Sequence, residues 1–312
     1  MLKAVDLKHI SVCIVLAGAV VGAEPVKLQY GRVDGETFVT TSSITRNSTI
    51  GDQGPKTDVN ETKSRVVAHR SEDGYENSVT ILSTKFEREG HSIASPLFAA
   101  MEDLELTYRL APDGKLREIA GYEKLVDALK AKFPPAISQT MAPLLNYHSI
   151  RLRDEAEYRE RYEGYIGTPY TPGTTQVSAK AHALPYGGTI LLYVVTEVGE
   201  LSDCGENRCL TLTQTYNSDP QKLAAAVDTF DIETLQAAAT GVEAALPKNH
   251  MLASVEGSGE IVLEPNTLFL VSRKSSDDVE IVISQLEKDP LKISMNELRE
   301  FTSEREAKAA SE

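Results

Sequence analysis

The chain has 312 residues, of which 41% are hydrophobic and 25% are charged, and its formal net charge is −14 at pH 7. This composition is that of an ordinary globular protein and excludes a low-complexity chain. An acidic surface without a basic stripe repels phosphate backbones, so we expect no nucleic-acid partner.

The first 23 residues have the layout of a secretory signal peptide. Lys3 and Lys8 precede an uncharged run over residues 10–23, which ends in small residues. We predict cleavage after Ala23 and a periplasmic or secreted mature protein with a net charge of −15, since two lysines and one aspartate are removed. The run is shorter than the about 20 residues that cross a bilayer, so we expect no transmembrane segment in the mature chain. The alternative is an uncleaved N-terminal anchor.

Residues 26–120 alternate between apolar and polar side chains, as half-buried strands do. The clearest example is the run from Leu104 to Leu110, in which every second residue is apolar. A Pro-Asp-Gly turn at residues 112–114 then predicts a hairpin. The polar stretch over residues 47–60 indicates a loop between strands.

A helical block follows over residues 122–165. We predict helices at 122–133, 135–145 and 152–165. The Pro134-Pro135 pair ends the first helix, and the second, which Pro135 opens, ends near Leu145. Tyr158, Tyr162 and Tyr165 form a stripe at helical spacing, which is typical of a packing edge. The alternative for this stripe is an amphipathic lid over a pocket.

A second strand block is predicted over residues 175–285. Residues 190–195 are apolar at both parities, which predicts a strand buried on both faces. An alanine-rich helical region follows Asp219, and Asp277-Asp278 indicates a turn between the last strands. Ser294 and Glu297 have capping-box spacing, so we predict a polar C-terminal helix or tail over residues 294–312.

Cys204 and Cys209 are the cysteines that remain after cleavage, and they flank a Gly-Glu-Asn-Arg turn. In an oxidising compartment we expect them to form a disulfide across a β-hairpin. A redox role fits less well, because the spacing is not Cys-x-x-Cys at a helix start.

These elements predict one α+β domain over residues 24–293. Its curved antiparallel sheet, an open half-barrel made of the strand blocks 26–120 and 175–285, is covered by the helices at 122–165.

The chain has no nucleophile elbow, P-loop, zincin or dinucleotide motif. Its histidines are scattered, and acidic pairs are expected by chance among 46 carboxylates. We therefore predict no catalytic residue, metal or cofactor. A hydrolase with an unconventional site is the least favoured alternative.

The segment LTYRLAPDGKLREIAGYEKLVDAL, residues 106–129, resembles a family of exported bacterial proteins with a domain of unknown function. More remotely, the layout is similar to the half-barrels of periplasmic lipoprotein carriers and related mycobacterial lipoproteins. That resemblance implies a shelter for acyl chains between sheet and helices.

The resulting hypothesis is an exported, non-enzymatic protein that binds an apolar ligand or an envelope partner in this groove. The alternative is an envelope scaffold with no small-molecule pocket. The side chains that we expect to line the groove are Tyr108, Leu125, Leu129, Phe133, Met141, Tyr193 and Val195.

Overall fold

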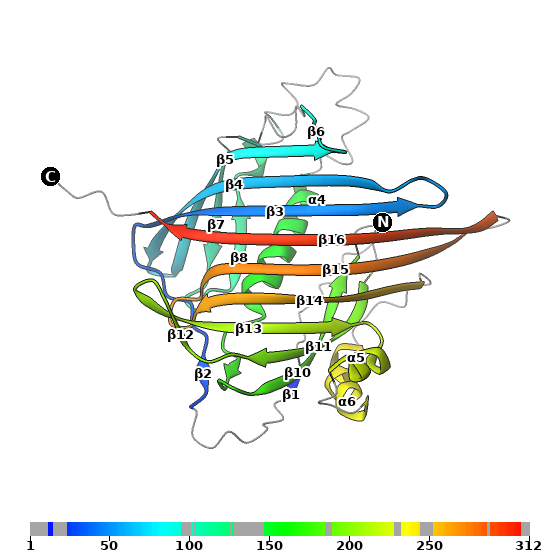
Figure 1. The fold of residues 1–312 in the computed structure, drawn as a ribbon. Helices are drawn as coiled ribbons and strands as arrows, with labels where there is room; N and C mark the ends of the chain where they lie inside the picture. Colours follow the sequence, from blue (N-terminus) through cyan, green and yellow to red (C-terminus); the bar gives the residue numbers. More distant parts are fainter. Residues whose placement is uncertain are drawn as a thin grey trace.

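The protein is built around one open antiparallel sheet (Figure 1). The computed structural model describes residues 12–14, 24–94, 101–102, 104–124, 127, 147–184, 189–227, 232–243, 252–285 and 288–306. Strands make up 63% of the structure and the short helices 14%. The predicted α+β class is therefore wrong, because the chain is mainly β and its described helices are few and short.

Neighbouring strands of the main sheet are all antiparallel, and its far ends, β1 and β8, do not pair with each other in the described part of the chain. In order along the sheet, the strands are β1 (Val12–Ile14), β10 (Thr175–Ala183), β11 (Thr189–Val198), β13 (Asn207–Asn217), β14 (Leu252–Glu264), β15 (Phe269–Gln285), β16 (Lys288–Arg305), β3 (Glu36–Ile50), β4 (Lys56–Ser71), β5 (Gly74–Arg88), β7 (Glu105–Leu110) and β8 (Leu116–Ala120).

Four short strands lie beside this path. β12 (Ser202–Cys204) pairs with β13, and β6 (His91–Ser92) pairs with β5. β2 (Val26–Lys27) pairs with β9 (Pro169–Tyr170) in a separate two-stranded sheet.

The C-terminal strand β16 joins the two predicted strand blocks, because it pairs with β15 on one side and β3 on the other (Figure 1). The predicted C-terminal helix is therefore wrong over residues 294–305. Ile293, Met295 and Phe301 point to the same buried side of β16, and Glu297 shares it. A buried glutamate in this row interrupts the apolar alternation, and its spacing from Ser294 matches a capping box by coincidence.

Two other predicted breaks are shorter than expected or absent, and the one between β3 and β4 is confined to residues 51–55. β3 and β4 run through most of residues 47–60, and the Thr57 hydroxyl donates a hydrogen bond of 2.7 Å to the Asn47 amide oxygen. β15 likewise passes through Asp277-Asp278 without a turn. In both places the polar side chains bond across strands, so their polarity does not mark a loop.

The sheet bends strongly around a helical segment formed by α4 (Tyr147–Tyr158) and the π-helical turn η1 (Arg159–Glu163). Glu160 lies 4.0 Å from Lys180 of β10, while Glu163 accepts a 2.6 Å hydrogen bond from the Leu116 amide of β8. β10 and β8 are ten strand steps apart, about 48 Å in a flat sheet at ~4.8 Å per step. One helical turn contacts both, so the sheet curves around it. We call the side facing η1 the inner face.

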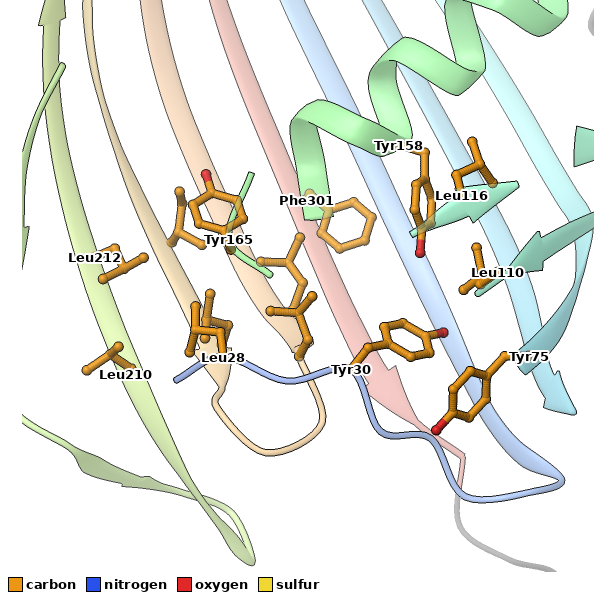
Figure 2. Packing of buried hydrophobic residues seen from close by; sticks show 14 of the residues in the cluster. Leu28, Tyr30, Tyr75, Leu110, Leu116, Tyr158, Tyr165, Leu210, Leu212 and Phe301 are labelled. Atoms are coloured by element: carbon orange, nitrogen blue, oxygen red, sulfur yellow. The ribbon is translucent and has the colours of Figure 1, made fainter. Parts of the chain in front are cut away.

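Under η1, the inner face is filled by the chain's own side chains (Figure 2). Tyr158 and Tyr165 are buried, and Tyr162 packs against the same cluster. The Tyr158 hydroxyl donates a 3.0 Å hydrogen bond to the Gly114 carbonyl. The tyrosine stripe is thus a packing edge, as predicted. Of the predicted helices before it, residues 122–124 are helical, and most of residues 125–146 lie outside the described residues.

The opposite, outer face carries α5 (Pro220–Val227) and α6 (Ile232–Glu243), which pack on β10 and β11. Leu223 and Leu235 of these helices contact Tyr193 and Val195 of β11 in one buried cluster. Leu192 and Val194 belong to a separate cluster on the inner face. The prediction that this strand is buried on both faces is confirmed.

The predicted signal segment contributes β1, which pairs with β10 so that Val12 lies opposite Ala179. Cleavage after Ala23 stays a prediction. Among the described helices, none combines the length and the apolar character required to cross a membrane.

Candidate ligand-binding site

The inner face has an apolar region beyond the part that η1 fills. We call this region the inner apolar face; it comprises Leu184, Leu192, Val194, Tyr216, Val255, Val279, Ile281, Ile293 and Met295. Among the described residues, every member except Leu184 comes from the sheet itself, from five neighbouring strands. The region is therefore a broad hydrocarbon surface on the inside of the bend.

Strand register sets this surface. Val194 of β11 lies opposite Tyr216 of β13, and Val279 of β15 lies between Val255 and Met295. Because side chains alternate between the two faces of a strand, matched register keeps these apolar groups on one side. The exposed fractions over the inner apolar face run from 0% for Leu192 to 7% for Tyr216, so its side chains are shielded from water in the folded chain.

A polar pocket lies between the inner apolar face and the cluster under η1. It is lined by Glu160, Lys180, His182, Leu192, Gln214, Tyr216, Gly259, Ile261, Arg273, Lys274, Ser275, Asp277 and Arg299, and its cavity volume is about 20 Å³. About 10–15 Å³ of such volume holds one water molecule. The pocket therefore admits a group of a few atoms only.

Glu160 is the carboxylate that η1 places in this pocket. It accepts a 3.3 Å hydrogen bond from Arg273 Nη2 and lies 4.0 Å from the Lys180 ammonium. Burial opposes its ionisation, but Lys180, Arg273, His182 and Arg299 outweigh burial and hold the pKa of Glu160 well below its usual range. The carboxylate is therefore charged, and it is surrounded by an excess of cationic groups.

Arg299 forms the second charged group of the pocket wall. It donates a hydrogen bond to Glu297 and lies 4.0 Å from Asp277. Glu297 is also bound by Arg46, whose Nε lies 2.7 Å from its Oε2. Burial opposes ionisation of Glu297, but Arg299 and Arg46 hold its pKa below the ordinary value. This network explains why a glutamate is tolerated on the buried side of β16.

Tyr216 anchors the pocket floor through a hydrogen bond that its hydroxyl donates to Asp277. Burial and the neighbouring Asp277 charge both raise the pKa of Tyr216, so it stays a neutral donor. The close approach needs glycine at position 257, because a Cβ there would lie 2.4 Å from the Ser276 carbonyl oxygen and 2.7 Å from the Tyr216 ring. The β14 backbone at Gly257 therefore packs directly against the Tyr216 ring.

The three predicted groove residues that the structure describes do not meet in one place. Tyr108 packs under η1, with its ring 5.8 Å from that of Tyr158. Tyr193 and Val195 lie on the outer face against α5 and α6. The remaining four lie outside the described residues: Leu125, Leu129, Phe133 and Met141.

The predicted disulfide is confirmed. Cys204 of β12 and Cys209 of β13 are bonded with a Cα–Cα distance of 5.7 Å, across the turn at residues 205–206. It lies at the end of its hairpin and does not line the pocket.

Among the described residues, no group of three or more His, Cys, Asp or Glu side chains is placed to hold a metal ion. The pocket's two carboxylates are each engaged by arginine or tyrosine.

Comparison with known proteins leaves the family open. No protein-family model and no curated protein matches the chain. A structure describing lipid–protein interactions in lipovitellin has a TM-score of 0.43 at 9% identity; the match covers 90% of this chain but only 26% of lipovitellin. Pseudomonas aeruginosa OccK7 has a TM-score of 0.21 at 8% identity, and the match covers 88% of this chain and 100% of OccK7. P. aeruginosa OccK2 in complex with glucuronate has a TM-score of 0.19 at 7% identity, and the match covers 87% of this chain and 98% of OccK2. All three scores are below 0.5 and carry no argument.

Proposed function

We propose that the protein is an exported binding protein that shelters an apolar ligand, such as a lipid acyl chain, on the inner apolar face. The observation that carries the proposal is the apolar surface itself, which five neighbouring strands present on the inside of the bend. Within the described residues no helix packs on it. Leu125, Leu129, Phe133 and Met141 stay our candidates for the opposite wall.

The energetics favour hydrocarbon as the occupant. Burying apolar area yields roughly 25 cal/mol per Å², or about 0.8 kcal/mol per CH₂ group. A chain of several methylene groups on this face is therefore stabilised by several kcal/mol before the entropy cost of binding. A polar occupant would leave its hydrogen-bonding groups unpaired against these side chains.

A matched pair of variants on β11 tests the proposal. Val194 faces the inner apolar face and Val195 the outer face, and both are 2% exposed. We expect both threonine substitutions to cost similar stability, about 1–3 kcal/mol, because each buries an extra hydroxyl. Only Val194→Thr should weaken binding of the neutral fluorescent probe N-phenyl-1-naphthylamine, by about tenfold, since ~1.4 kcal/mol corresponds to one decade.

Native mass spectrometry of protein purified from the periplasm gives the companion measurement. A co-purifying apolar mass that solvent extraction releases supports the proposal. A clean apoprotein that also ignores the probe would overturn it.

A clean apoprotein would favour the alternative function, an envelope scaffold without a small-molecule pocket. One observation supports this alternative. The part of the inner face under η1 is filled by the protein's own tyrosines and leucines.

A further inference from the structure

The polar pocket contains more hydrogen-bond donors than the surrounding chain uses. The Lys180 ammonium makes no hydrogen bond within the described residues, and its nearest carboxylate oxygen there is 4.0 Å away. Arg273 uses one nitrogen on Glu160, and Arg299 uses one on Glu297. A lysine offers three donors and an arginine five. Most donors of these three side chains therefore lack an acceptor in the described structure.

Water reaches these donors. The exposed fractions of the side chains are 29% for Lys180, 18% for Arg273 and 37% for Arg299. They therefore project into an accessible pocket and are not sealed in the core. A small anion entering the pocket meets three cationic side chains at its wall.

The local charge is positive although the whole protein carries −14. Three cationic side chains project into the pocket, Lys180, Arg273 and Arg299, against the two carboxylates Glu160 and Asp277; Lys274 lines it with its backbone, because its side chain lies on the other face of β15. One further pair at its border, Arg46 with Glu297, does not reverse this balance. His182 adds charge only when protonated, and burial lowers its pKa. An acidic protein thus holds a cationic pocket.

The pocket and the inner apolar face are continuous. Leu192 and Tyr216 belong to both, and Leu192 lies directly opposite Lys180 in the β10–β11 register. On β15, Asp277 in the pocket and Val279 on the apolar face are two residues apart, about 6.6 Å at ~3.3 Å per residue. One molecule therefore reaches both regions when its charged end and its hydrocarbon are directly joined.

We propose that the ligand is a carboxylate-headed amphiphile whose head group binds to Lys180, Arg273 and Arg299 while its chain lies on the inner apolar face. The proposal rests on the proposed function for the chain and adds the head group. Charge-assisted hydrogen bonds to a carboxylate suit these donors. The small cavity favours this three-atom group over a sugar or a large polar head.

The test compares laurate with 1-dodecanol, which has the same chain length but no charge, as competitors of N-phenyl-1-naphthylamine on delipidated protein. We expect laurate to displace the probe at least tenfold more effectively. Lys180→Met keeps the length of the side chain and removes its charge, so it should cut the laurate preference about tenfold and leave dodecanol unchanged. Lys180→Arg should retain the preference.

Lys292→Met is the matched control, because Lys292 is exposed on β16 and is not part of the pocket lining. It changes the net charge equally and should leave both competitors unaffected. Equal displacement by laurate and dodecanol would refute the head-group proposal while leaving the proposed function intact. Failure of both to bind would refute the proposed function as well. Acetate binding with the same Lys180 dependence, and with no gain from a longer chain, would identify a free-anion site and refute the amphiphile.

Discussion

Replacing Cys204 with serine removes the crosslink between β12 and β13 and leaves the buried Cys209 thiol in place. Cys209 is 0% exposed, whereas Cys204 is only partly buried, so the substitution spares the packing and isolates the effect of the bond. The two cysteines are five positions apart.

A loop of this size gives a definite expectation. In the chain-entropy model a closed loop of about six residues loses roughly 7 cal/mol/K, which is about 2 kcal/mol at 25 °C. For a chain of 312 residues, with an unfolding entropy of about 2.1 cal/mol/K per residue, that corresponds to a fall in Tm of about 3 °C. The hairpin itself should persist, because β13 also pairs with β11 and β14.

Thermal and urea unfolding of Cys204→Ser and wild type, each with and without dithiothreitol, measures the effect. Reduced wild type should match the variant, and the variant should not respond to the reductant. Unfolding of the variant at ambient temperature would refute the local role of the bond and show that it organises more of the sheet than its own hairpin.

Two further substitutions test the network around the pocket. The pKa of Glu297 in the folded protein is lowered, so its stabilising contribution is present above the unfolded pKa of about 4.5 and is lost as the pH falls below that value. Glu297→Gln should therefore reduce the change of the urea unfolding midpoint between pH 6 and pH 3. An unchanged pH dependence would contradict this. Gly257→Ala should destabilise the protein by about 2–4 kcal/mol by forcing Tyr216 and the β14 backbone apart, whereas Gly164→Ala, with nothing within 4 Å of the new Cβ, should be close to neutral. Equal unfolding midpoints for the two alanine variants would show that the floor is not tightly fitted.

Local sequence patterns predicted the hairpin disulfide, the tyrosine packing edge and the doubly buried β11. Each depends on neighbours within a few positions, which are visible in a single sequence. The failures have the opposite origin. The sequence around Glu297 matches a capping box, and it does not show that Arg46, 251 positions away, lies opposite Glu297 on the neighbouring strand β3. The pairing of β16 with β15 and β3, which are distant in sequence from each other, therefore makes this segment a strand and not a helix.

The face on which the β11 side chains lie was hard to predict for a related reason. On β11 both parities are apolar, and the sequence cannot say which one faces inward. We predict Tyr193 and Val195 for the groove, whereas Leu192 and Val194 line the inner face. The choice depends on where α5 and α6 dock, and that is a tertiary fact.

On β15, however, a signal was present. Arg273, Asp277 and Val279 share one parity, so a single alternating row passes from charged to apolar along the strand. A strand that is buried along one face seldom places charges in that row unless partners or a ligand meet them. Charged residues in register with a buried apolar row therefore mark a polar site inside a sheet, even where no short motif exists. Here one strand, β15, supplies both the pocket wall and the adjoining apolar face. In the proposed complex, the head group and the hydrocarbon chain of the ligand would therefore both contact β15.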